Sequence, residues 1–323
     1  MKIAVLREAG GLGDVVATEP AVRGLKEQYP GAEIWYACLP EYGELVAGWP
    51  MPPDVYLAVE RRERRDRDAA PDGARRPYLS AFRDFDRVVD LFCPAFQYER
   101  ARAHRTDKSR VRLFCEAAGV RVSAPEQTVT EAREHWAGGW LAGRGVRADR
   151  PLVGLQPVSC GARRNWPIER WAELSRGLEK IGVEVLVFHT FARAVRSVRG
   201  LKAAGLRLGE LAALAARCDL LVTPDSGLLH LASALGIPTL SLWGSTNPHA
   251  TCELYPRAEA IWPRESAARP RACRAPCYSL RGSLAPECRA KGCLLLRSIR
   301  PEEVLARARG MLESSGRPRA RAR

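Results

Sequence analysis

Short apolar runs alternate with longer segments of helical period in the first half of the chain. Short apolar runs favour strands, and apolar residues spaced three to four apart favour helices. The resulting order of strand, helix and strand is typical of a parallel sheet. Strands are predicted at 2–6, 33–38, 55–59 and 87–91, with helices at 14–28, 41–47, 107–119 and 131–142.

The same alternation starts again at Pro151 and predicts a second α/β domain, with the boundary near 145–149. We therefore assign residues 1–148 to the first domain and 149–300 to the second. Pro301 favours the start of a last helix, 301–313, and the tail 314–323 is expected to be disordered. Strands of the second domain are predicted at 152–156, 184–188, 220–223 and 239–242, with helices at 168–181, 209–216 and 227–235.

The composition is that of a folded protein of two domains. The 323 residues are 46% hydrophobic and 27% charged, which suits two apolar cores and is unlike a disordered chain. Arg7 and Glu8 end the first apolar run, so we expect no secretory signal and a cytoplasmic protein. No transmembrane helix is expected, and the ten cysteines are expected to be reduced thiols.

Positive charge is concentrated near the C-terminus. The net charge is +14, yet residues 1–150 carry 24 basic and 23 acidic groups, whereas 264–323 carry 15 and 5. A solvated basic tail explains the excess, and peripheral contact with the anionic inner face of a membrane is the alternative. No nucleic-acid-binding module accompanies the charge, so no specific nucleic-acid partner is expected. The arginine-rich segment 61–77 is interpreted as a solvated loop.

The first of three loops with candidate chemistry is Glu8-Ala-Gly-Gly-Leu-Gly-Asp14. It lacks the spacing of a dinucleotide fingerprint and the lysine of a P-loop. Its Asp14 lies at the start of a helix, at the mouth of the cleft expected between two α/β domains. A carboxylate at this place fits a general base, and an N-cap aspartate is the alternative interpretation.

The second and third loops combine hydroxyl groups, charges and helix N-termini. The second, Gln156-Pro-Val-Ser159-Cys-Gly-Ala-Arg-Arg164-Asn-Trp-Pro167, fits a diphosphate site, although its arginines could instead be surface charges. The third, Asp225-Ser-Gly-Leu-Leu-His230, follows a buried strand and opens a helix whose first amides suit phosphate or sugar oxygens. The alternative makes Asp225 an N-cap and His230 a core histidine.

In this order and at these distances, the three loops resemble the heptosyltransferase-type enzymes of glycosyltransferase family nine, over nearly the whole chain. The most specific match is Asp225-Ser-Gly-Leu-Leu-His230-Leu-Ala-Ser-Ala-Leu-Gly236 in its strand-helix setting. The other matching pieces are Gly13-Asp14-Val15, Pro20-Ala-Val-Arg23, Arg164-Asn-Trp-Pro167, Leu208-Gly-Glu-Leu-Ala212, Trp243-Gly-Ser-Thr-Asn-Pro248 and Cys273-x3-Cys277-Tyr278.

The resemblance implies a GT-B fold, in which two Rossmann-like domains enclose a cleft. The first domain would bind the acceptor, the second would bind the nucleotide sugar, and the helix 301–313 would cross back onto the first. Asp14, beside Gly13, would deprotonate the acceptor hydroxyl for an inverting attack, and Arg164 would neutralise the departing diphosphate. No cofactor is implied for this chemistry. The remaining donor-binding residues by position are Ser159, Asp225, Ser226, Gly227 and His230.

The resemblance also implies ADP-heptose as the donor and a hydroxyl of a glycan or glycolipid, such as a lipopolysaccharide core, as the acceptor. The chain departs from the family at 188–193, where members carry a glycine-rich segment with a glutamate. Another nucleotide sugar, or a protein or small-molecule acceptor, is therefore an alternative. A non-catalytic binding protein on a degenerate transferase scaffold is a further one, which the retained Asp14, Arg164 and third loop disfavour. The basic segment 93–112 is either an anionic-acceptor surface or a solvated helix.

Four cysteines lie within 21 residues near the end of the second domain. Their number fits a tetrahedral site for structural zinc or iron, although the spacing is looser than paired C-x2-C knuckles. A reduced loop without metal is the alternative. The candidate ligands are Cys273, Cys277, Cys288 and Cys293.

Overall fold

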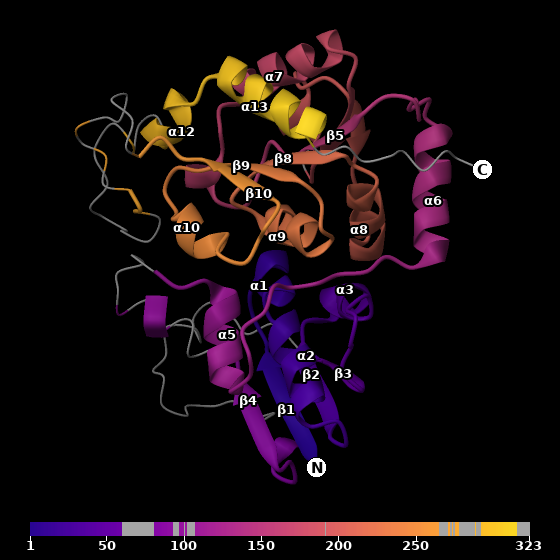
Figure 1. The fold of residues 1–323 in the computed structure, drawn as a ribbon, viewed down its shortest axis with the longest axis vertical. Coiled ribbons are helices and arrows are strands. Elements are labelled where there is room, and N and C mark those ends of the chain that lie inside the picture. The colour runs from indigo at the N-terminus through magenta and orange to yellow at the C-terminus, as the bar shows by residue number, and fades with distance from the viewer. Residues whose placement is uncertain are drawn as a thin grey trace.

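A computed structural model gives the fold of the chain as two α/β domains, one above the other in Figure 1. The structure describes residues 1–59, 81–92, 97–99, 101, 107–190, 192–264, 271, 273, 275–277, 288 and 292–314. The whole predicted arginine-rich loop, 61–77, and all but the first residue of the predicted tail lie outside these residues. No helix in the described ranges is long and apolar enough to cross a membrane.

The first domain is built on a parallel sheet of four strands in the order β3-β2-β1-β4. β1 lies in the middle, and every residue of it after Lys2 is buried, as its apolar run predicts. Val5 of β1 is in register with Tyr36 on one side and Val89 on the other. The strands are β1 (Lys2–Arg7), β2 (Glu33–Cys38), β3 (Val55–Ala58) and β4 (Arg87–Asp90).

The segment predicted as one helix, 14–28, is two helices with a turn at Thr18. Pro20 has no backbone N–H to continue the first helix, and the Thr18 hydroxyl donates to the carbonyl of Val15 at 2.7 Å. This break lets the first helix leave the sheet toward the second domain. The helical elements of this domain are α1 (Leu12–Val16), α2 (Glu19–Gln28), η1 (Pro40–Tyr42), α3 (Gly43–Val46) and α5 (Arg110–Ala118).

The second domain has a parallel sheet of six strands in the order β10-β9-β8-β5-β6-β7. Its four central strands are those that the sequence predicts. β7 and β10 were not predicted, because these two edge strands are short and partly exposed and carry no distinct apolar run. The strands are β5 (Leu152–Leu155), β6 (Glu184–Phe188), β7 (Leu201–Ala203), β8 (Leu220–Pro224), β9 (Thr239–Leu242) and β10 (Ala258–Ile261).

Helices cover both faces of this second sheet (Figure 1). α6, which the sequence analysis assigns to the first domain, packs against α8 beside the second sheet. The helical elements are α6 (Glu131–Ala142), η4 (Ala162–Arg164), α7 (Ile168–Lys180), η5 (Ala192–Val195), α8 (Leu208–Ala216), α9 (Gly227–Ala234), α10 (Pro248–Thr251), α12 (Leu294–Ser298) and α13 (Pro301–Ser314).

The last helix, α13, does not cross back onto the first domain, so that expectation was wrong. It packs on α7 and β8, and its buried residues Val304, Ala308 and Met311 belong to the apolar core around the second sheet. Gly177 of α7 admits the helix, because a Cβ atom there would lie 2.7 Å from a methyl carbon of Leu305. Burial of this apolar stripe against α7 decides where the helix lies.

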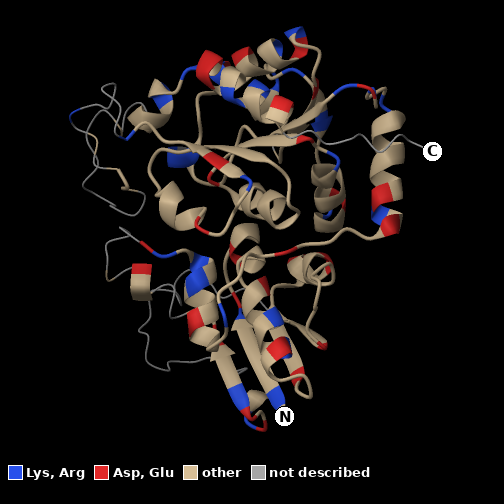
Figure 2. Ribbon diagram, in the orientation of Figure 1, with Lys and Arg blue, Asp and Glu red and all other residues tan. Residues whose placement is uncertain are grey.

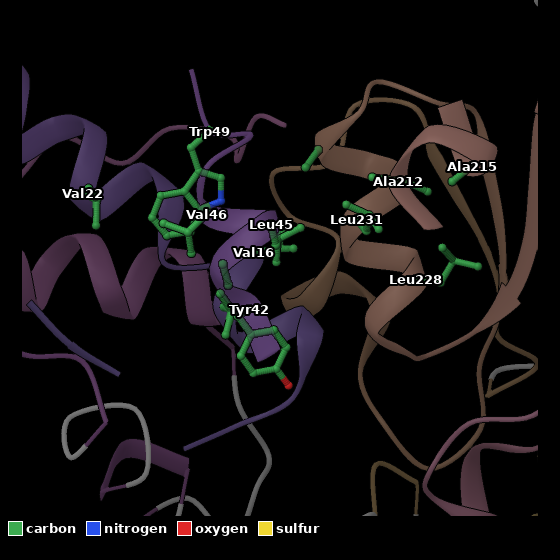
Figure 3. Packing of buried hydrophobic residues seen from close by; sticks show 14 of the residues in the cluster. Val16, Val22, Tyr42, Leu45, Val46, Trp49, Ala212, Ala215, Leu228 and Leu231 are labelled. Carbon is green, nitrogen blue, oxygen red and sulfur yellow. The ribbon is translucent and has the colours of Figure 1, made fainter. Parts of the chain in front are cut away.

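The two domains meet where α1 packs against α9 (Figure 1). One continuous apolar cluster spans the contact, and Figure 3 shows Val16 and Leu45 of the first domain on the side facing Leu231 of the second. A polar contact flanks it: the backbone N–H of Gln127 donates to the carbonyl of Ala234 at 3.0 Å. The loop after β1 and the loop after β8 are therefore held together at the carboxyl ends of the two sheets.

Candidate active site

Asp14 lies in the first turn of α1, directly after β1. Its Oδ2 accepts a hydrogen bond from the backbone N–H of Gly11 at 2.8 Å, which caps the helix. Gly11 is the N-cap and Asp14 is the third residue of the helix, so the interpretation of Asp14 as the N-cap was wrong; its carboxylate instead bonds back to the N-cap amide. The other oxygen, Oδ1, faces two arginines and is free of the helix, so Asp14 can make this bond and act as a base.

The Asp14 carboxylate is held in its charged form. Its Oδ1 lies 3.5 Å from Nη2 of Arg7 and forms a close ion pair with Nη1 of Arg110. Burial opposes ionisation, but the charges of Arg110 and Arg7 and the Gly11 amide outweigh it and hold the pKa of Asp14 well below its usual range. Asp14 is consequently a carboxylate at neutral pH.

Gly13 brings the first loop against the third. A Cβ atom on Gly13 would lie 2.3 Å from Cδ2 and 2.9 Å from Nε2 of His230. A Cβ atom on Gly227 would in turn lie 2.7 Å from Cβ of Leu12. Both predicted glycines thus serve close helix packing across the domain contact, and this packing sets the imidazole beside the Asp14 loop.

His230 is partly buried and is held in place by a residue that the sequence analysis missed. Its Nδ1 lies 2.5 Å from the hydroxyl of Tyr255, and the two rings pack edge to face with centroids 5.5 Å apart. Burial lowers the pKa of His230, although the charges of Asp225 and Asp14 oppose the shift. The imidazole is therefore neutral at pH 7. Tyr255 lies 25 residues beyond His230, outside every motif, so no local signal indicated it.

The third loop joins the second through an ion pair. Nη1 of Arg164 lies 3.5 Å from Oδ2 of Asp225, and the Asp225 side chain is 11% exposed. The Ser226 hydroxyl turns into the fold, where it bonds to the Gln156 side chain and lies 2.9 Å from the Thr223 hydroxyl. Ser226 is the N-cap of α9 but its side chain does not cap it, so the first amides of α9 keep the orientation of an anion site.

Ser159 and Asn165 close the second loop. The side-chain carbonyl of Asn165 accepts from the Ser159 amide at 2.8 Å and from its hydroxyl at 2.9 Å. The indole of Trp166 donates to the carbonyl of Ile299 at 3.2 Å and anchors the loop to the second domain. The Ser159 hydroxyl thus shapes the loop that presents Arg164. Asn165 was part of the quoted motif, but its role was not predicted.

The cysteine cluster adjoins the second loop. The Cys277 amide donates to the carbonyl of Ser245 at 2.7 Å, and the Ser245 hydroxyl donates to the carbonyl of Arg163 at 3.3 Å. Burial raises the pKa of the Cys277 thiol to about 11, and the three other thiols of the cluster add to that effect. The cysteines in the described ranges are free thiols, as expected, but no three His, Cys, Asp or Glu residues there are arranged to hold a metal ion.

Two curated relatives are lipopolysaccharide heptosyltransferases. Heptosyltransferase 2 of Salmonella typhimurium is 30% identical over 130 residues, which cover 36% of this chain and 37% of that protein. Heptosyltransferase 1 of Pseudomonas aeruginosa is 27% identical over 283 residues, covering 76% and 80%. The match to the first relative thus spans little more than a third of either protein.

Solved structures of low identity share the fold. A family 9 glycosyltransferase of Veillonella parvula has a TM-score of 0.71 at 21% identity, covering 97% of both chains. The ADP-heptose lipopolysaccharide heptosyltransferase II of Escherichia coli has a TM-score of 0.67 at 20% identity, covering 97% of this chain and 99% of that one. The iron-containing dodecameric glycosyltransferase TibC of enterotoxigenic E. coli has a TM-score of 0.64 at 15% identity, covering 97% and 76%. These likenesses agree with the GT-B fold that the sequence predicts.

A protein-family model described as glycosyltransferase family 9 (heptosyltransferase) matches residues 72–279. The matched region contains Ser159, Arg164 and the third loop, whereas Asp14 precedes it. Since this match covers more than half of the chain, the protein belongs to glycosyltransferase family 9, the heptosyltransferase family.

Proposed function

We propose that this chain is an inverting glycosyltransferase that transfers heptose from ADP-heptose to a hydroxyl of a lipopolysaccharide core. The observation that carries the proposal is the meeting of an ionised carboxylate, Asp14, with the donor-side motif at His230 across the α1–α9 contact. Family membership supports glycosyl transfer as the reaction class. The base would come from one domain and the donor-binding groups from the other.

The reaction can be written with the groups that these loops supply. The acceptor oxygen attacks the anomeric carbon as its proton passes to Asp14; the bond from that carbon to the diphosphate oxygen breaks, and ADP leaves. Arg164 and the first amides of α9 would compensate the charge that develops on the diphosphate. A protonated Asp14 then returns its proton to water, so the cycle balances without a cofactor.

Burial and charge suit Asp14 and Arg164 to these roles. The Asp14 side chain is 14% exposed and the Arg164 side chain is 21% exposed, so each reaches solvent while much of it is desolvated. Charges in such partly dry positions act more strongly than charges at an open surface. The ion pair with Asp225 also keeps the Arg164 guanidinium in one orientation before a diphosphate arrives.

The choice of ADP-heptose rests on relatives, because the chain departs from the family after β6. A solved E. coli relative was crystallised with ADP, and TibC was solved in complex with ADP-D-β-D-heptose. In this chain His189 follows β6, and burial together with the charge of Lys202 lowers its pKa. Because His189 stands where family members carry a glycine-rich segment, another nucleotide sugar is the second candidate donor. Thermal shifts with ADP, UDP, GDP and CDP should be largest for ADP under the proposal.

The acceptor assignment implies work at a membrane surface, because lipopolysaccharide core is built on a lipid. We propose a peripheral contact with the inner face, supported by the 15 basic and 5 acidic groups of residues 264–323. Flotation with vesicles of anionic lipid tests it, with zwitterionic vesicles as the control. Binding that is equal for both vesicles, or absent from both, contradicts the contact.

We also propose a structural rather than catalytic metal at the four cysteines. Mutual proximity of the thiols supports it, since each of the others contributes to the raised pKa of Cys277. An iron-containing relative of the same fold is consistent with it. Four thiolates would leave no open coordination position for a reactant. The thiols are not arranged for coordination in this structure, so they would have to close around the ion.

The direct test is ADP release from ADP-heptose in the presence of lipopolysaccharide that lacks heptose. The proposal predicts release that depends on both substrates and a product with inverted anomeric configuration. Replacement of ADP-heptose by UDP-glucose is the donor control. Acceptor-dependent release of UDP from the control donor at the same rate as ADP from ADP-heptose, or retention of configuration, would contradict the proposed reaction.

A further inference from the structure

Two arginines of different character contact the same oxygen of Asp14. Arg7 is the last residue of β1, and its side chain is 5% exposed. Arg110 is the first residue of α5, and its side chain is 45% exposed. Figure 2 shows basic residues at this end of α5, which points toward the second domain. One guanidinium therefore reaches Asp14 from within the first domain and the other from its surface.

Arg7 is fixed on several sides. Its Nη1 donates to the carbonyl of Leu91 at 3.1 Å, and the guanidinium carbon lies 5.0 Å from the ring centroid of Phe114 and 5.6 Å from that of Phe92. A buried guanidinium needs a nearby anion, and Asp14 lies 3.5 Å away. Arg7 cannot leave Asp14 without leaving its own charge buried.

Arg110 has a second carboxylate partner besides Asp14. Its Nε and Nη2 donate to the two carboxylate oxygens of Glu99 at 2.5 and 2.8 Å, a bidentate pair, while Nη1 contacts Oδ1 of Asp14. Glu99 can therefore keep the guanidinium paired after it releases Asp14. The exposed position also allows water to replace the lost contact.

We propose that Arg7 is a positioning residue that keeps Asp14 oriented and ionised throughout turnover, and that Arg110 is a cover on Asp14 that moves off when the acceptor binds. This rests on the proposed function, because it takes Asp14 as the base. Gly11 takes one acceptor position on Oδ2 and Arg110 takes one on Oδ1, so the departure of Arg110 opens the exposed side of Oδ1 to the acceptor hydroxyl. The fixed arginine and the helix cap would then hold the base in place.

The departure of Arg110 also changes the basicity of Asp14. The charges of both arginines lower the proton affinity of the carboxylate, and removal of one of them raises it. The remaining neighbours do not replace that charge, since the nearby imidazole and phenol are neutral. Among the described residues, the titratable or charged groups near Asp14 are Arg7 from β1, Arg110 from α5, His230 from α9 and Tyr255 after α10. Glu99 contacts Arg110 on its other side.

Double-mutant cycles in urea unfolding test the two roles without any substrate. One cycle combines Arg7→Met with Asp14→Asn, and the other combines Arg110→Gln with Asp14→Asn. We expect the Arg7–Asp14 coupling to change the unfolding equilibrium constant by roughly tenfold or more, as for a buried pair. We expect the Arg110–Asp14 coupling to be about threefold or less and to vanish in high salt, as for an exposed pair.

Equal coupling in the two cycles, or no coupling for Arg7, would overturn the assignment whether or not the chain is a heptosyltransferase. If Arg7→Met does not fold, Arg7→Lys replaces it, because lysine keeps the charge but lacks the planar fork that contacts both Leu91 and Asp14. Lys108→Gln is the matched control for charge removal beside α5, since Lys108 pairs with Glu116 and not with Asp14. The control should show no coupling to Asp14→Asn.

Kinetics with ADP-heptose and heptose-deficient lipopolysaccharide separate the cover from a permanent partner. The acid limb of kcat/KM reports free enzyme and that of kcat reports the substrate complex. Arg110→Gln should move the first limb to higher pH and leave the second unchanged, whereas Arg7→Lys should lower kcat about tenfold or more and move both. A shift of the kcat limb in Arg110→Gln, equal to its kcat/KM shift, would show that Arg110 never leaves Asp14. Absence of all transfer, with the unfolding result as expected, would instead reject the proposed function and leave the fixed Arg7 pair intact.

Discussion

Gly13 and His230 approach so closely that a single added Cβ atom on the glycine would lie 2.3 Å from the imidazole. The two residues belong to different domains, one to α1 and the other to α9. Their contact fixes the distance between the loop that carries Asp14 and the helix that opens the donor-side motif. The packing of Gly13 thus sets the position of the proposed base relative to the proposed donor-binding helix.

Gly13→Ala should separate the two domains locally. Backbone or imidazole must shift to accommodate the methyl group, which should cost about 1–3 kcal/mol of stability and reduce turnover at least tenfold. Urea unfolding and ADP release measure the two effects. Gly139→Ala is the control, because a Cβ atom at that position of α6 meets nothing within 4 Å and should leave turnover unchanged. Full activity and stability in Gly13→Ala would contradict the packing role.

Asp14→Asn tests the base. The change keeps the size of the side chain but removes its ability to accept a proton, so turnover should fall about 10²–10⁴-fold. ADP affinity should change little, because the diphosphate is assigned to Arg164 and α9. Turnover and calorimetric ADP binding are measured on the same preparation. An Asn variant with turnover like that of the unchanged protein would eliminate Asp14 as the base.

Arg164→Ala tests the diphosphate site. Loss of a charge-assisted contact should weaken ADP binding by about 1.5–3 kcal/mol, measured by calorimetry. Arg163→Ala is the matched control, since it removes the same charge from the neighbouring position, to which no diphosphate role is assigned. Only Arg164 pairs with Asp225 in the described contacts. Equal losses in the two variants, or none in Arg164→Ala, would reject the assignment.

The sequence predicted the central strands and the chemistry-bearing loops, but not the side-chain partners. β2, β6, β9 and α6 begin and end where their apolar patterns predict, because local burial decides them. Arg110 meets Asp14 across 96 residues, and that contact depends on how α5 packs against α2 and β4. Tyr255 likewise reaches His230 from a loop without a pattern. Tertiary packing sets such pairs, and one sequence does not contain their distances.

The partly buried His230 should make the protein acid-sensitive. Burial lowers the pKa of His230 in the folded state, so below about pH 6.5 the unfolded chain binds a proton that the folded chain does not. Stability is therefore lost as pH falls from about 7 toward 5, and His230→Gln should show a shallower loss. Melting temperatures at both ends of this range measure the difference. A variant with the same pH dependence as the unchanged protein would contradict a His230 that is neutral in the folded state.

Metal content decides the proposed role of the four cysteines. The thiols of Cys277 and Cys293 have raised pKa values because burial and the neighbouring thiols disfavour thiolates, and a bound divalent ion would reverse that preference. Protein purified without a metal-binding tag should therefore contain about one equivalent of zinc or iron, absent from a Cys277→Ser/Cys288→Ser variant. Chelation should lower the melting temperature before it affects ADP binding, since the Ser245 contact links the cluster to the second loop without placing a thiol among the proposed donor-binding residues. Less than about a tenth of an equivalent of zinc plus iron would mean that the four cysteines are reduced thiols without a metal.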